Sequence, residues 1–198
     1  MKNYEVRNIQ LKRFYLSNRL YFITTVTEDR VPIFSNEQNI RLLFGAISEF
    51  SHRYAVKIHA FVVLPDHTHL LITPTTDTFT ISHFMKGVKG KSAREINRLR
   101  MVKTDETGAV NIGTVETVPT KPNVGTDSSV PVSTRVWQHQ FLDHVIRNTE
   151  DYRAHIEYIH NNPVKHGLCK EAGEFKWSSY RYYMNGEDVM IPISEVSW

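Results

Sequence analysis

The stretch FVVLPDHTHLLI, residues 61–72, decides the predicted fold. It is apolar at both ends and contains a Pro-Asp pair in the middle, which is typical of a short connection between two antiparallel strands. We therefore predict strands over 56–63 and 67–73. Successive side chains of a strand point to opposite faces, so His67 and His69 project together. Two imidazoles on one face are half of a metal site.

Other predicted elements flank this hairpin. Residues 20–27 are rich in aromatic and β-branched side chains and indicate a first strand. Hydrophobic residues recur at helical spacing from Ile40 to Tyr54, which predicts an amphipathic helix. A second helix is predicted over 79–100, and a fourth strand over 136–141.

A third helix is predicted after Asn148 or Thr149, either of which can cap its first turn. We expect Pro163 to stop this helix, because proline disfavours helical geometry in the residue before it. Tyr158 and Asn162 are four residues apart and so share one face, about 6 Å apart along the axis. If that face lies over the histidine pair, the site contains two imidazoles, an amide and a phenol.

The order strand, helix, strand, strand, helix, strand is that of an α+β, ferredoxin-like βαββαβ sandwich with an antiparallel sheet. An additional C-terminal helix carries Tyr158. We predict one domain over 1–198. Residues 102–134 lose all periodicity and are rich in Thr, Gly, Pro and Ser, so we predict a flexible insertion there.

Composition places the chain among globular proteins. It has 198 residues, of which 40% are hydrophobic and 23% charged. The single cysteine, Cys169, excludes an internal disulfide framework and fits a reducing compartment. The first residues lack the apolar run of a signal peptide, and no window is apolar enough for a membrane span. We therefore expect an intracellular protein that does not enter a membrane.

Basic residues cluster although the formal net charge is only +3. One cluster lies near the N-terminus and the other on the second predicted helix, where only Glu95 opposes it. Clustered positive charge is typical of proteins that bind a phosphate backbone, although a solvated helix face kept charged for solubility is an open alternative. Our candidate nucleic-acid contacts are Arg7, Lys12, Arg13, Lys86, Lys89, Lys91, Arg94 and Arg98.

The predicted site suits metal-assisted phosphoryl transfer. Two neutral imidazole nitrogens and one amide oxygen leave coordination positions open, which favours a catalytic Mg²⁺ or Mn²⁺ over a closed zinc site. A phenol with an ordinary pKa of about 10 is a poor nucleophile and needs cationic surroundings or a base. Attack by Tyr158 on a phosphodiester would conserve the bond energy in a phosphotyrosine. This chemistry predicts strand cleavage and rejoining, not hydrolysis.

Three segments, taken in order, resemble the single-tyrosine HUH transposases, and among them the branch of REP-associated tyrosine transposases. They are VVLPDHTH at 62–69, WQHQFLDHVIRN at 137–148 and YIHNNPVKHG at 158–167. The resemblance implies that His67 and His69 bind the metal, that Asn162 is the third protein ligand, and that Tyr158 is the nucleophile. It also implies a 5′-phosphotyrosine intermediate with a free 3′-hydroxyl.

The same resemblance implies a substrate and a setting. The substrate would be single-stranded DNA beside a hairpin from a repetitive extragenic palindrome, in the bacterial cytosol and in association with the nucleoid. A monomer is expected, with a dimer as the alternative.

Other interpretations stay open at this point. The chain could be a non-catalytic ferredoxin-like module that binds DNA or RNA hairpins by phosphate contacts and aromatic stacking. A replication or conjugation relaxase shares the same residue types. Several further histidines crowd the C-terminal half, and one of them could assist Tyr158 or replace a ligand; they are His139, His144, His155, His160 and His166.

Overall fold

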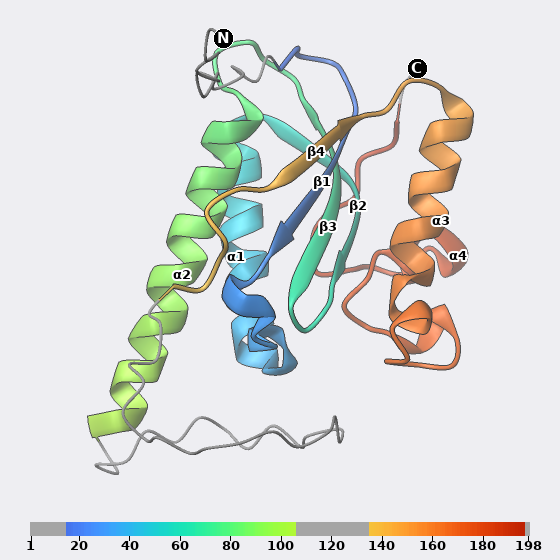
Figure 1. The fold of residues 1–198 in the computed structure, drawn as a ribbon. Helices are drawn as coiled ribbons and strands as arrows, with labels where there is room; N and C mark the ends of the chain where they lie inside the picture. Colours follow the sequence, from blue (N-terminus) through green and yellow to red (C-terminus); the bar gives the residue numbers. More distant parts are fainter. Residues whose placement is uncertain (1–14, 106–134, 197–198) are drawn as a thin grey trace, which may run out of the picture.

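The computed structural model describes residues 15–105 and 135–196 of the chain (Figure 1). Its helices and strands follow in the order β1 (Tyr21–Val26), α1 (Glu37–Arg53), β2 (Val56–Val63), β3 (His67–Pro74), α2 (Ile81–Asp105), β4 (Leu142–Val145), α3 (Thr149–Lys165) and α4 (Tyr180–Asn185). Short 3-10 helices lie at Glu28–Arg30, Ile33–Ser35 and Ala172–Glu174. The order contains the predicted βαββαβ succession, followed by the helix that carries Tyr158.

The strands of the described residues form one antiparallel sheet in the order β2-β3-β1-β4. The hairpin β2–β3 pairs along its length, with one irregularity between Ile58 and Ala60. Strand β1 lies between β3 and β4, so the last strand of the chain pairs with the first at the edge of the sheet. This is the ferredoxin-like arrangement, and the predicted fold class is confirmed.

The sheet separates two layers of helices (Figure 1). Helices α1 and α2 cover one face, and their apolar side chains form a core with residues such as Tyr21 and Ile23 of β1. Helix α3 lies on the other face, above Phe22 of β1 and Leu71 of β3. Because side chains alternate along a strand, His67 and His69 share the face of Leu71 and point toward α3.

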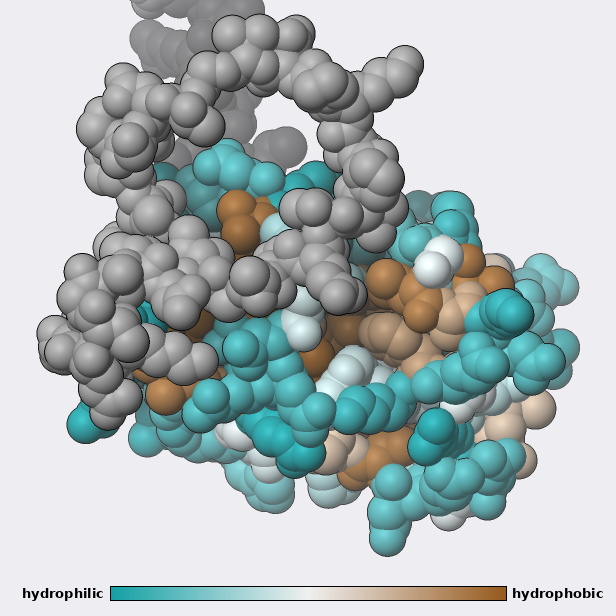
Figure 2. Space-filling model, turned by 90° about the horizontal axis from the view of Figure 1, so that it is seen from below, coloured by the Kyte–Doolittle hydropathy of each residue, from teal (hydrophilic) through white to brown (hydrophobic). Residues whose placement is uncertain are grey.

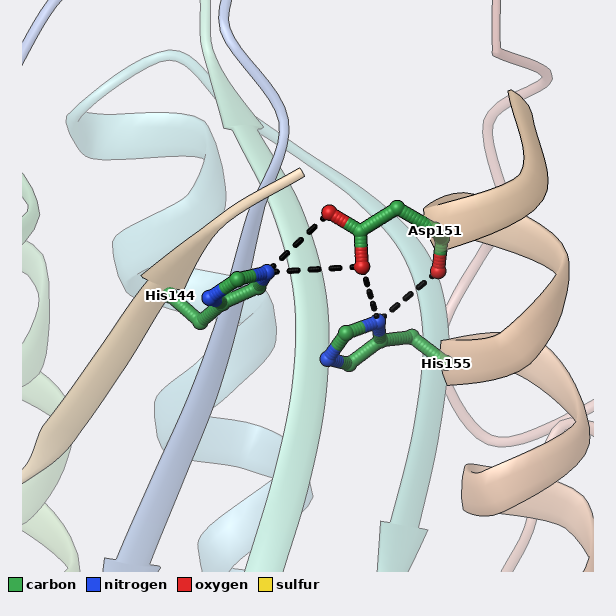
Figure 3. A group of neighbouring side chains, drawn as sticks. All are labelled: His144, Asp151 and His155. Atoms are coloured by element: carbon green, nitrogen blue, oxygen red, sulfur yellow. Dashed lines mark hydrogen bonds and ion pairs between the residues drawn. The ribbon is translucent and has the colours of Figure 1, made fainter. Parts of the chain in front are cut away.

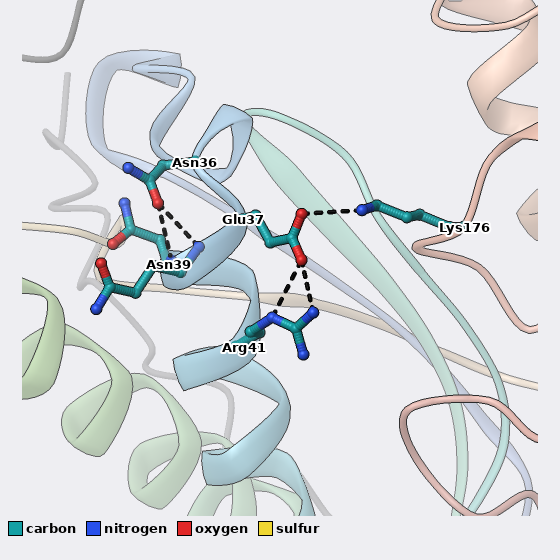
Figure 4. Close-up of polar contacts among 6 residues, drawn as sticks. Asn36, Glu37, Asn39, Arg41 and Lys176 are labelled. Atoms are coloured by element: carbon teal, nitrogen blue, oxygen red, sulfur yellow. Dashed lines mark hydrogen bonds and ion pairs between the residues drawn. The ribbon is translucent and has the colours of Figure 1, made fainter.

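Polar contacts fix the start of α1 (Figure 4). The side chain of Asn36 accepts hydrogen bonds from the backbone amides two and three residues later. Glu37 accepts hydrogen bonds from Lys176 and Arg41, and these, that of Lys176 first, hold the pKa of the Glu37 carboxyl below its usual range. A carboxylate in the first turn suits the helix dipole, and its contact with Lys176 ties the C-terminal segment to α1.

Gly87 lets α2 approach α1 closely. A Cβ atom at this position would lie 2.5 Å from Cδ1 of Phe50, which is buried in the α1–α2 core. We expect Gly87→Ala to lower the free energy of unfolding by about 1–3 kcal/mol through overpacking, despite the better helix propensity of alanine. The matched control is Gly45→Ala on α1, where a Cβ meets nothing within 4 Å. Urea titration should show this control at or slightly above the stability of the parent protein, and equal losses in both variants would contradict the packing explanation.

The predicted fourth strand over 136–141 is wrong, since β4 begins at Leu142. Trp137 makes only an isolated bridge to Thr27, and its indole is drawn into the α1–α2 core, where Nε1 donates to the hydroxyl of Ser92 over 3.0 Å. The Nζ atom of Lys89 then binds the next three backbone carbonyls, those of residues 138–140. The amide of Gln138 still donates to the carbonyl of Val26, the last residue of β1. Regular pairing with β1 then begins only where Leu142 lies opposite Thr24.

Of the two predicted candidates, Asn148 caps α3, since its side chain accepts a hydrogen bond from the backbone amide of Asp151. The expectation that Pro163 stops the helix is wrong, because α3 continues to Lys165. The end is set by Gly167, which adopts the left-handed conformation at φ +68°. Its amide and that of Leu168 donate to carbonyls in the last turn, which satisfies them as glycine caps commonly do.

Helix α2 also ends later than predicted, at Asp105, so residues 102–105 are helical. The remainder of the predicted insertion, from 106 to 134, lies outside the described residues, as does the N-terminal arm up to residue 14. Seen from below, the part of the surface that is coloured by hydropathy is mainly hydrophilic, with smaller hydrophobic patches (Figure 2). None of the described helices combines the length and apolar character needed to cross a membrane.

Candidate active site

A polar stripe runs along the face of α3 that meets the sheet. Its members recur every three or four residues, as neighbours on one helix face do, and they are Asp151, His155, Tyr158, Asn162 and His166. An apolar stripe beside it, formed by Tyr152, Ile156 and Ile159, packs into the core under the helix. The apolar stripe therefore anchors α3 on the sheet while the polar stripe is presented to β1, β3 and β4.

The two histidines of β3 lie side by side beneath this helix. Their ring centres are 5.0 Å apart, and both side chains are buried. Asp66 lies 2.5 Å from Nδ1 of His67, and the hydroxyl of Thr24 lies 2.8 Å from Nδ1 of His69. When these oxygens accept the Nδ1 protons, Nε2 of each ring carries a lone pair. Partners of this kind orient metal-binding histidines in proteins.

Tyr158 meets the histidine pair from the opposite layer. Its ring centre lies 5.1 Å from that of His69 and 5.8 Å from that of Phe22. The ammonium group of Lys165 lies 5.6 Å from the centre of the phenol ring. The side chain is 41% exposed, although its ring rests on buried residues. The phenol is therefore both held in place and accessible to a large substrate.

Asn162 occupies the next turn of the same stripe, between Tyr158 and His166. The ring of His166 lies 5.3 Å from that of His67, so Asn162 is flanked by two residues that each contact one histidine of the pair. Asn162 is only 1% exposed, and within the described residues neither of its amide atoms has a hydrogen-bond partner. The buried Nε2 atom of His69 lacks one in the same way. Buried polar atoms are rarely left unpaired, so the unpaired atoms of His69 and Asn162 fit a site that binds a polar ligand or a cation.

The donor set fits a divalent cation. Burial, followed by the neighbouring His67 and His166, lowers the pKa of His69 to about 3, so this ring is neutral at physiological pH and free to coordinate. Two imidazole nitrogens and the amide oxygen of Asn162 leave room for water and phosphate oxygens in an octahedral shell, as Mg²⁺ and Mn²⁺ require. These are the three residues that the sequence proposed as metal ligands.

A second cluster lies at the start of α3, and the sequence analysis did not assemble it (Figure 3). It consists of His144 of β4 with Asp151 and His155 of α3, whose potential ligand atoms lie within 4.8 Å of one another. However, Nδ1 of His155 lies 2.8 Å from the backbone carbonyl of Asp151, which can only accept, so this nitrogen carries a proton and is not free for a metal. The unpaired atoms of His69 and Asn162 make the first site the better metal centre.

The other candidate histidines lie elsewhere. His139 is exposed. His59 of β2, which is not among these candidates, is buried against the carbonyl of Ser194 and the hydroxyl of Thr73. Nε2 of His160 lies 3.0 Å from the hydroxyl of Ser179, and its ring packs against Tyr180 and Tyr183. His160 therefore joins α3 to the C-terminal segment.

Burial lowers the pKa of His160 from 6.5 to about 4. As the pH falls below 6.5, the unfolded chain takes up a proton at this residue before the folded one does, so stability present above pH 6.5 is lost between pH 6.5 and 4. Between pH 6.5 and 4, we expect His160→Gln to reduce the slope of the unfolding free energy against pH by up to roughly 1.4 kcal/mol per pH unit. Urea titrations at several pH values measure this slope. The exposed His52→Gln should leave the slope unchanged, and an equal slope in parent and His160→Gln would contradict the assignment.

The predicted basic contacts lie on α2, on the face of the sheet opposite α3. Lys86, Arg94 and Arg98 are exposed there. Lys89 is bound to backbone carbonyls, and Lys91 pairs with Glu49 and Glu95, of which the hydrogen bond with Glu49 most raises the pKa of Lys91. Arg7, Lys12 and Arg13 lie outside the described residues.

Comparisons with known proteins find transposases that are similar to this chain. The family model "Transposase IS200 like" matches residues 15–108. The chain is 26% identical to a REP-associated tyrosine transposase of Escherichia coli K12 over 189 residues, which covers 96% of this chain and 90% of that protein. It is also similar to a solved structure of a REP-associated tyrosine transposase bound to a REP hairpin, with a TM-score of 0.61, 25% identity and coverage of 100% and 94% of the two chains.

Proposed function

We propose that the chain is a single-tyrosine HUH transposase of the REP-associated branch, and that it cleaves and rejoins single-stranded DNA beside hairpins through Tyr158. The observation that carries this proposal is the meeting of three features in one place. The accessible phenol of Tyr158 rests against His69, and both His69 and the neighbouring Asn162 retain unpaired buried atoms. A nucleophile beside a set of vacant ligand atoms is what metal-assisted phosphoryl transfer needs.

In the proposed reaction the phenol oxygen of Tyr158 attacks the phosphorus of a phosphodiester. The bond from phosphorus to the 3′-oxygen breaks, which leaves a free 3′-hydroxyl and a 5′-phosphate linked to the tyrosine. A 3′-hydroxyl that later attacks this linkage restores a phosphodiester and releases Tyr158. Because the linkage conserves the bond energy, rejoining needs no external energy source.

Some side chains would bind the metal ion, and others orient the side chains that bind it. His67, His69 and Asn162 would hold Mg²⁺ or Mn²⁺, which when bound neutralises charge on the phosphoryl oxygens. Asp66 and Thr24 keep the two imidazoles oriented. Lys165, which lies over the phenol ring, is placed to offset negative charge near the attacking oxygen.

We propose a DNA hairpin as the substrate because a similar protein has been solved with a REP hairpin bound. Part of the bound DNA would extend beyond the face that carries Tyr158. Its phosphates would contact the exposed basic residues of α2, Lys86, Arg94 and Arg98, and those of the N-terminal arm, Arg7, Lys12 and Arg13. Such an enzyme would act as a monomer in the bacterial cytosol on nucleoid DNA.

The test is a covalent capture assay. The full chain is incubated with end-labelled single-stranded hairpin DNA and Mn²⁺ or Mg²⁺, and denaturing gels are examined for protein that carries label. We expect an adduct that needs the metal and disappears on chelation. Salt-sensitive binding of the hairpin without any adduct would instead support the non-catalytic binding module and would contradict the transferase.

A further inference from the structure

The cluster at the start of α3 holds one imidazole in a single protonation pattern (Figure 3). Nδ1 of His155 lies 2.8 Å from the backbone carbonyl of Asp151 and 3.0 Å from a carboxylate oxygen of the same residue. Both oxygens accept, so the proton of His155 sits on Nδ1. The lone pair of the neutral ring is therefore on Nε2.

Asp151 is itself firmly placed. Its carboxylate accepts from Nε2 of His144 at 3.1 Å and from the backbone amide of Arg147 at 3.0 Å. Burial acts to raise the pKa of the Asp151 carboxyl, but the Arg147 amide and His144 outweigh it and the pKa is lowered overall. The rings of His144 and His155 stack with centres 4.9 Å apart. The carboxylate of Asp151 and the stacked ring of His144 thus disfavour a flip of the His155 imidazole ring.

His155 and Tyr158 lie against the same side chain of β1. His155 precedes Tyr158 by three residues on the polar stripe, and residues at this spacing are neighbours on the helix surface. Both rings rest on Phe22, whose ring centre is 4.6 Å from that of His155 and 5.8 Å from that of Tyr158. In Figure 3 the second ring nitrogen of His155 points away from Asp151 and out over the sheet.

We propose that His155 is a further catalytic residue, the base that accepts the phenol proton of Tyr158, and that Asp151 and His144 are positioning residues for it. The inference rests on the proposed function. As the phenol oxygen bonds to phosphorus, its proton passes to Nε2 of His155, and the departing 3′-oxygen takes a proton from solvent. In rejoining, His155 returns the proton to the tyrosine oxygen as its bond to phosphorus breaks.

The arrangement suits a base better than a structural contact or a second metal site. An Asp–His pair that fixes the tautomer and leaves the far nitrogen free is the arrangement that enzymes use to activate a hydroxyl nucleophile. His144 on β4 and Asp151 on α3 contact His155, and its charge also acts on the pKa of His69 on β3. Tyr158 is the next titratable residue on the same face of α3, three residues along the helix. Among these, only Tyr158 is a hydroxyl nucleophile.

The test compares His155→Gln with the matched control His52→Gln in the covalent capture assay. His52 lies on α1, far along the chain from the site, and its Nδ1 likewise contacts the carbonyl four residues earlier at 2.8 Å. We expect His155→Gln to slow adduct formation by about 10²–10⁴-fold, the usual contribution of a general base, with hairpin affinity and metal-induced thermal stabilisation unchanged. His52→Gln should retain the parent rate.

A second measurement separates a base from a packing residue. Difluorotyrosine at position 158 has a more acidic phenol, so it should restore the rate of the His155→Gln protein by about 10-fold or more while changing the parent rate little. A His155→Gln rate within about threefold of the parent, or a slow rate that difluorotyrosine does not restore, overturns the base role while the transferase stands. If the parent forms no adduct at all, the proposed function fails and this inference falls with it.

Discussion

Replacing Tyr158 by phenylalanine is expected to reduce the rate of covalent adduct formation by about 10⁴-fold or more, since loss of a nucleophile removes the chemical step itself. The ring would keep its contacts with His69 and Phe22, and only the hydroxyl would be lost. Hairpin affinity and thermal stability should therefore stay close to those of the parent. The capture assay and a binding titration on the same samples measure both properties.

The control for this substitution is Tyr152→Phe. Tyr152 lies on the same helix but on the apolar stripe, where its hydroxyl is 3.3 Å from that of Tyr183. We expect this variant to form the adduct at nearly the parent rate. Adduct formation that survives in Tyr158→Phe, or that fails equally in Tyr152→Phe, would contradict the assignment of the nucleophile.

Replacing Asn162 by leucine is expected to have two effects of opposite sign. The metal-free protein should gain about 1 kcal/mol or more of unfolding free energy, because a buried amide without partners is exchanged for an apolar side chain of similar size. Affinity for Mn²⁺ should fall by at least about 10–100-fold, because one of the three proposed protein ligands is lost. Thermal unfolding with and without Mn²⁺, together with a direct metal titration, separates the two effects.

Asn161→Leu provides the matched control. Asn161 is the exposed neighbour of Asn162 on the same helix, so its replacement should change neither metal affinity nor the metal-free stability by much. Unchanged Mn²⁺ affinity in Asn162→Leu would remove Asn162 from the metal site. A large loss of stability in the metal-free variant would show instead that the amide has structural partners.

Several parts of the fold followed from local sequence because local physics decides them. The Pro-Asp connection and the flanking apolar residues were enough to predict β2 and β3, and period-two geometry was enough to place His67 and His69 on one face. The spacing of Tyr158 and Asn162 likewise put them on one side of α3. These features depend on neighbours within a few residues, so no tertiary information was needed.

Other parts were set by contacts that sequence periodicity does not encode. The start of β4 depends on Trp137 reaching Ser92 and on Lys89 binding distant carbonyls, so the strand was predicted too early. The end of α3 depends on the left-handed Gly167, which outweighs the effect of Pro163. Gly167 itself was a usable signal, because glycine just beyond a helix commonly ends it.

The residues that surround Tyr158 and the histidine pair were the least predictable from sequence. Thr24 supports His69 only because β1 and β3 pair in one particular register, which brings these two residues opposite each other. His144 meets Asp151 only because β4 lies where the sequence analysis did not place it. Asp66, by contrast, directly precedes His67 and could have been recognised as its hydrogen-bond partner rather than as a turn residue alone.

The most direct measurement is to identify the residue that carries the DNA. The adduct formed by the parent protein with hairpin DNA is digested with nuclease and protease, and the remaining nucleotide is located by mass spectrometry. We predict a 5′-phosphorylated nucleotide on the oxygen of Tyr158 and on no other tyrosine. A nucleotide attached to Tyr152, Tyr180 or Tyr183, or one linked through its 3′-phosphate, would contradict the account.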